Sequence, residues 1–179
     1  MTVAIVRMLY HHGAWADARV LDYAARLTPE QLTAPGTAGH GSIRDTLVHA
    51  IATQRAWLTW LDGSLPPEEA MRLRIDPATL PDVPAVREQW AAVQEQTQRF
   101  LARLTGDDLN REMTSRTPWG GTLRATLGEL VVHVACHGTQ HRSEVAAMLT
   151  AFGQSPGNLD VLRFILEGQP TSPAGQEPA

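Results

Sequence analysis

The chain has 179 residues, 43% of them hydrophobic, and a formal net charge of −4, which suits one ordinary globular domain with its own core. The acidic balance provides no basic face for nucleic acid, and because all 15 cationic residues are arginine, lysine-dependent chemistry is excluded. The single cysteine, Cys136, excludes an internal disulfide and a multi-cysteine zinc site.

No stretch approaches the roughly 20 apolar residues needed to span a bilayer. The N-terminal segment MTVAIVRMLYHHGAWAD is interrupted by histidines and charge too early for a signal sequence, and it has no cleavage pattern. We therefore expect no membrane association and a cytoplasmic location.

Four long segments have the hydrophobic spacing of amphipathic helices, and they run from about residues 2 to 27, 42 to 61, 86 to 104 and 123 to 152. A capping-box pattern at Thr28 and Gln31 predicts a short helical turn after the first. Residues 63–84 form a proline-rich loop, and the Pro-Trp-Gly-Gly turn within residues 107–122 is compatible with a small hairpin before the fourth helix.

Residues 158–167 predict a short extra C-terminal helix, whereas residues 169–179 have the composition of a disordered tail. The four long helices together predict an all-α four-helix bundle in a single domain over residues 1–168.

The fourth helix carries the densest group of histidines, in the segment HVACHGTQHRSEV. A helix advances 100° per residue, so His137 and His141 project to nearly the same side, close to the apolar stripe around Val134. Two imidazoles one turn apart, about 6 Å, can both reach one metal ion at roughly 2.0–2.1 Å from each nitrogen. The competing interpretation is that both are core residues satisfied by neighbouring polar groups.

The neighbours of these histidines leave several alternatives open. Glu144 points close to the direction of His137, so it is a solvated carboxylate, a carboxylate that supports or lines the metal site, or a group that closes that site. His133 lies beyond the edge of the stripe and either packs between helices or contacts the metal or its water. Cys136 projects from the opposite face. The sequence lacks both the paired Glu-x-x-His elements of a di-iron bundle and the His-Glu-x-x-His of a metalloprotease.

A further ligand must come from another helix, and His49 is the only histidine within the second one. It points nearly opposite to the main apolar stripe of that helix, towards a second face with small and aromatic residues. Its neighbours on that face are Ala52, Thr53, Ala56 and Trp60. Periodicity alone does not show that this face is buried.

Several segments resemble the DinB-like family of metal-dependent four-helix bundles, also called DinB/YfiT-like proteins. They are HHGAWADARVL (11–21), SIRDTLVHAIATQRAWL (42–58), HVACHGTQHRSEVAAML (133–149) and the closing GQSPGNLDVLRFI (153–165). The resemblance covers nearly all of residues 1–168. It implies one divalent metal ion held by His49, His137 and His141, with a coordination position left open.

Characterised members of that family are similar to thiol-dependent transferases and isomerases. The resemblance implies that the metal binds a low-molecular-weight thiol such as bacillithiol, mycothiol or glutathione, and that its thiolate attacks an electrophilic substrate. Zinc and nickel are the expected metals, although copper and iron also accept imidazole ligands. Tyr10, His12, Trp15 and Arg142 are candidate cleft residues, with Arg142 suited to a carboxylate of the thiol.

Two other functions remain open. One is a non-enzymatic stress-response protein that binds a metal or another ligand, and the other is a helical dimer whose metal only stiffens the fold. Because bundles of this kind associate through helix faces, we expect a homodimer.

Overall fold

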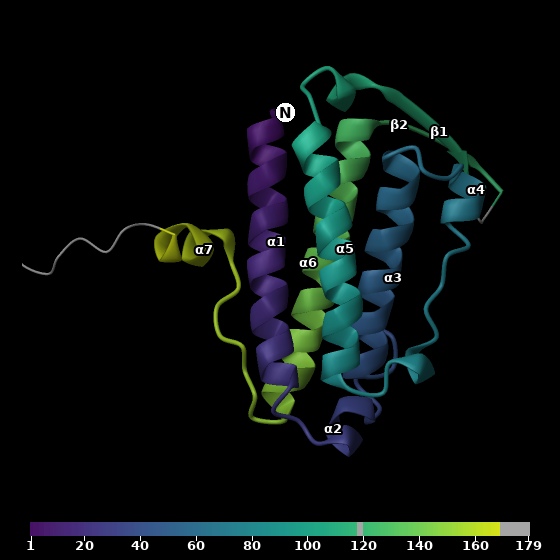
Figure 1. The fold of residues 1–179 in the computed structure, drawn as a ribbon. Coiled ribbons are helices and arrows are strands. Elements are labelled where there is room, and N and C mark those ends of the chain that lie inside the picture. The colour runs from purple at the N-terminus through teal and green to yellow at the C-terminus, as the bar shows by residue number, and fades with distance from the viewer. Residues whose placement is uncertain (118–119, 169–179) are drawn as a thin grey trace, which may run out of the picture.

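The structure, a computed structural model, describes residues 1–117 and 120–168 (Figure 1). Four long helices lie side by side: α1 (Val3–Ala24), α3 (Ile43–Leu61), α5 (Val83–Arg103) and α6 (Leu127–Ala151). The packed pairs α1–α6, α6–α3, α3–α5 and α5–α1 close a four-helix ring around one core. This confirms the all-α bundle, while the predicted tail at residues 169–179 lies outside the described residues.

Each long helix begins at a polar side chain that accepts a hydrogen bond from a main-chain N–H in the first helical turn. The four capping residues are Thr2, Ser42, Asp82 and Thr126. All four helices then contribute fully buried apolar side chains to the core, among them Val6, Val20, Ile51, Leu58, Val86, Leu101, Val131 and Leu149. Burial of this apolar surface supplies the main driving force for the fold.

Short elements connect the long helices. The predicted capping box starts α2 (Pro29–Thr33), and the proline-rich loop holds α4 (Pro67–Ala70) and the 3-10 turn η1 (Pro77–Thr79). The turn η2 (Asp108–Asn110) leads into a hairpin of β1 (Glu112–Arg116) and β2 (Thr122–Thr126). This hairpin extends past the end of α3 towards α4, and α7 (Val161–Glu167) lies on the outer side of α1 (Figure 1).

The fourth long helix starts later than its periodicity predicts. Leu123, the predicted first residue, lies in β2 and is paired with Ser115 of β1. The helix begins at Leu127, where Thr126 and Glu129 form a capping box. The prediction was wrong at this boundary because the four-residue spacing of Leu123 and Leu127 fits one face of a helix and is also a multiple of the two-residue period of a strand. In the described part of the chain, no helix combines the length and apolar character needed to cross a membrane.

Candidate metal centre

Four imidazole rings meet where α3 and α6 pack together. The ring centroids of His137 and His141 on α6 lie 4.3 Å apart, and His49 of α3 lies 4.8 Å from His141 and 5.4 Å from His137. His40, from the loop before α3, stacks on His49 with 3.5 Å between centroids. One ring nitrogen from each of His40, His49 and His141 lies within 4.8 Å of the other two, so these three form a candidate metal site.

Glu144 orients His141 from behind. The Nδ1–H of His141 donates a hydrogen bond of 2.6 Å to Glu144 Oε2, so the neutral ring carries its lone pair on Nε2. Burial acts to raise the pKa of Glu144, but the hydrogen bonds donated by Gln140 and His141 outweigh it and keep that pKa below its usual value. Glu144 is therefore an ionised carboxylate that is hydrogen-bonded to the ring of His141.

The two histidines of α6 are spaced as ligands of one ion would be. Their Nε2 atoms lie 3.1 Å apart, with the rings inclined at 70°. Two nitrogens bound at 2.0–2.1 Å to one tetrahedral zinc ion are separated by roughly 3.3 Å, which is close to this distance. The donor set, imidazoles without a thiolate, fits zinc, nickel, copper or iron.

Burial and mutual repulsion keep the rings of His40, His49 and His137 neutral. The pKa of His49 and the pKa of His137 are both lowered to about 4, first by burial and then by the neighbouring histidines, and the pKa of His40 is lowered for the same reasons. Near neutral pH each of these three rings therefore has one nitrogen lone pair that a cation can use.

We expect the metal-free protein to lose stability in mild acid. The pKa values of His49 and His137 are about 4 in the folded chain and about 6.5 in the unfolded one, so the unfolded chain binds more protons in this range. The resulting stabilisation is fully present above pH 6.5 and is lost as the pH falls through 4. Because both rings are partly solvated, we expect roughly 1 kcal/mol from each, or about 2–4 °C in Tm.

Thermal unfolding of the metal-free protein at neutral and acid pH tests this expectation. The matched control is the His49→Gln/His137→Gln variant, whose Tm should fall less over the same pH interval. An equal fall in both proteins would contradict a role for these two rings.

The structure places the candidate residues of α1 in packing contacts away from the histidine cluster. Tyr10 donates its hydroxyl to the carbonyl of Val131 at 3.1 Å, and His12 Nε2–H donates to the carbonyl of Leu159 at 2.7 Å. Trp15 donates its indole N–H to a carboxylate on α7. These side chains hold α6 and the C-terminal segment against α1, and a role for them in a cleft stays a prediction.

Arg142 also has an internal partner. Its Nη1 donates to Asp17 Oδ1 at 3.1 Å, and the two side chains are only 10% and 9% exposed. This ion pair joins α6 to α1, so the guanidinium is already engaged by a carboxylate of the chain itself. His133 lies one turn before His137, with 6.2 Å between ring centroids, and packs in a T-shaped contact with Trp57, with 5.0 Å between centroids.

The sequence reasoning missed His40. This residue lies in the irregular segment GTAGHGS, where no periodicity indicates a direction for its side chain. The available signal was the glycine on each side: Gly39 and Gly41 have φ values of +69° and +101°, a region that favours glycine. A Cβ at Gly39 would lie 2.3 Å from Thr46 Oγ1, the atom that accepts the hydrogen bond of the His40 main-chain N–H at 2.9 Å.

The fold and the site together define a four-helix bundle protein with a candidate histidine metal centre between two of its helices. The model of the DinB family matches residues 1–172. This chain belongs to the DinB family, as its sequence segments indicate. It is 24% identical over 153 residues to Protein DinB of Bacillus subtilis (strain 168), an alignment that covers 85% of this chain and 88% of that protein.

Proposed function

We propose that this chain is a metal-dependent enzyme that transfers a low-molecular-weight thiol to an electrophilic carbon. The observation that supports it best is the position of His49. Its ring belongs to the histidine cluster and also lines an adjoining cavity of about 520 Å³. A cation at the cluster would therefore lie next to a space large enough for an organic substrate.

We propose His49, His137 and His141 as the ligands, with zinc or nickel as the metal. The spacing of the two α6 nitrogens and the tautomer fixed by Glu144 both support this set. His40 covers the site from the loop side and adds a fourth imidazole that an incoming ligand can displace. A divalent cation bound there would favour the thiolate form of a bound thiol, which is the reactive nucleophile.

The side chains around the cavity would position the electrophile. Trp57 and Trp60 provide an apolar wall that excludes water, and His49 brings the ligand cluster to the edge of the same space. In the proposed transfer the thiol loses its proton to solvent, and its sulfur forms a bond to the substrate carbon. The leaving group departs with the bonding electron pair, so charge and atoms balance.

We expect the metal-loaded protein to conjugate monochlorobimane with one of bacillithiol, mycothiol or glutathione at least about tenfold faster than the thiol alone, a lowering of the barrier by about 1.4 kcal/mol. The fluorescent product provides the readout. His137→Ala should return the rate to the background, whereas His11→Ala, an exposed histidine of α1, should not change it. If none of the three thiols reacts faster with the protein than without it, the transferase proposal fails.

His40 also favours a second candidate, a non-enzymatic stress-response protein that binds metal. Four imidazoles would complete a tetrahedral shell and leave no position for a thiol. Visible absorption of the cobalt-substituted protein distinguishes the two functions. A spectrum that changes when the thiol is added supports the enzyme, and one that stays unchanged while His40→Ala alters it supports the binding protein.

A further inference from the structure

The cavity next to His49 has mostly apolar walls from parts of the chain that are far apart in sequence. It is bounded by α3, by the segment after α4, by the hairpin and by the start of α6. Its volume of about 520 Å³ lies within the range of small-molecule sites. The large apolar side chains that line it are Trp57, Trp60, Met71, Leu73, Leu123 and Leu130.

One side of this cavity is suited to a flat, aromatic-sized group. Trp57 and Trp60 lie 5.3 Å apart between ring centroids, and the edge contact between Trp57 and His133 extends the same aromatic surface. Ala52 and Ala56, on the same face of α3, line the cavity with small side chains. Aromatic rings pack favourably on such surfaces at centroid separations of 4.5–7 Å.

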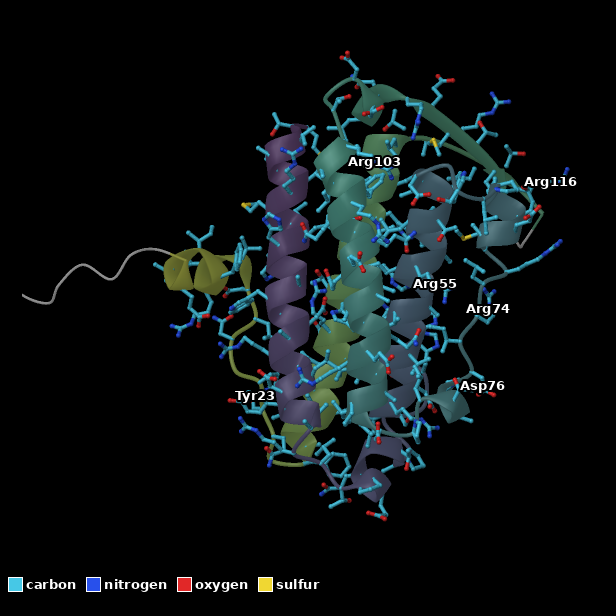
Figure 2. All side chains as sticks on the ribbon, viewed as in Figure 1. Tyr23, Arg55, Arg74, Asp76, Arg103 and Arg116 are labelled. Carbon is cyan, nitrogen blue, oxygen red and sulfur yellow. The ribbon has the colours of Figure 1, made fainter. Side chains whose placement is uncertain are left out.

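The charged side chains of the cavity are all of one sign. Arg74 and Arg116 line it, and no carboxylate does so among the residues that the structure describes. Figure 2 places Arg74 on the segment beside α3 and Arg116 at the end of the hairpin near α4. Arg74 Nη1 donates to the main-chain carbonyls of Met71 and Leu73 at 2.6 and 2.8 Å, which fixes the guanidinium without neutralising its charge.

Two guanidinium groups at one cavity, with no carboxylate among its described lining residues, attract anions even in a chain with a net charge of −4. Arginine is suited to binding an anion, because its planar guanidinium group can donate hydrogen bonds to both oxygens of a carboxylate.

We infer that this cavity binds an organic carboxylate whose aromatic body lies against Trp57 and Trp60 and whose charge is recognised by Arg74 and Arg116. The additional step, that this carboxylate is the electrophilic substrate, rests on the proposed function. The binding itself needs no metal, so it can be measured on the metal-free protein, where the carboxylate has no cation to coordinate.

Isothermal titration of metal-free protein with naphthalene carboxylate and with the neutral naphthalene carboxamide tests both parts of the inference. We expect the carboxylate to bind more tightly than the carboxamide. Arg74→Gln and Arg116→Gln should each weaken carboxylate binding by about threefold to tenfold and leave carboxamide binding unchanged. Arg103→Gln, an exposed arginine of α5 outside this cavity, is the matched control and should change neither.

A variant that fills the cavity tests its location. Ala56→Trp should weaken binding of both compounds by at least about tenfold, because the added indole occupies part of the cavity that Ala56, Trp57 and Trp60 line. Circular dichroism establishes that each variant is folded, and Ala56→Leu takes its place if Ala56→Trp does not fold. Excess glutathione should fail to displace the carboxylate, since a polar tripeptide does not match the apolar walls.

Equal affinities for the two compounds, or a carboxylate affinity unchanged in the Arg74→Gln/Arg116→Gln variant, would overturn the assignment of an anion. Binding that survives the filled cavity, or no binding at all, would overturn the location. Displacement by glutathione would assign the cavity to the thiol instead. Failure of the thiol-transfer reaction would change none of these results, so the two proposals fail separately.

Discussion

His49→Ala and His137→Ala should both be purified without metal, whereas the wild-type chain should carry about one divalent ion. Each substitution removes one of three proposed imidazole ligands, and two ligands hold a divalent ion far more weakly than three do. Metal content is measured by mass spectrometry on protein purified without an affinity tag. His11→Ala, which changes an exposed histidine of α1, should retain the wild-type metal content.

Metal content also distinguishes between two possible ligand sets. One is His49, His137 and His141, and the other is His40, His49 and His141. His40→Ala should keep the ion with an affinity reduced by about tenfold, because it loses a displaceable fourth ligand and keeps the proposed three. Loss of metal in His40→Ala with retention in His137→Ala would instead identify His40, His49 and His141 as the ligands. Absence of metal in the wild type after reconstitution would reduce these histidines to polar residues of the core.

Arg142→Ala should destabilise the fold by about 3–5 kcal/mol, because it leaves the buried carboxylate of Asp17 without its cation. Burial already raises the pKa of Asp17 to about 6, although the charge and hydrogen bond of Arg142 act to lower it. Without Arg142 the pKa of Asp17 rises further. The destabilisation should therefore be greatest above pH 6 and should shrink in acid, where Asp17 takes up a proton.

Urea unfolding at neutral pH and in mild acid measures this effect. The matched control is Arg87→Ala, which breaks an exposed ion pair with Asp22 and should change the free energy of unfolding by less than about 1 kcal/mol. An Arg142→Ala protein as stable as the Arg87→Ala protein would show that the Asp17–Arg142 pair does not hold α1 to α6.

The bundle could be predicted from the sequence because each long helix buries a continuous apolar stripe, and such a stripe leaves a local signal of known period. The helix boundary at Leu123 could not be predicted from the sequence. Whether a short apolar segment becomes a strand depends on the segment with which it pairs. That partner, Ser115 in β1, is chosen by the hairpin turn and by the Thr126 cap. The small-residue face of α3 around His49 was visible as a pattern, but only the structure shows that it borders a cavity.

The candidate site, too, could be predicted from the sequence only in part. The four-residue spacing of His137 and His141 is a local property of one helix, and the sequence displays it directly. The position of His40 depends on the φ values of two loop glycines, which no periodicity encodes. The pair of Arg142 with Asp17 joins positions 125 residues apart, so it follows from how α1 packs on α6.

The junction between the hairpin and α6 has no linker. β2 ends at Thr126, α6 begins at Leu127, and the N–H of Leu127 donates to the carbonyl of Arg111 just before β1. Leu123 on the strand and Leu130 on the helix both line the cavity beside His49. A ligand in this cavity therefore contacts the strand and also the first turn of the helix that carries His137 and His141.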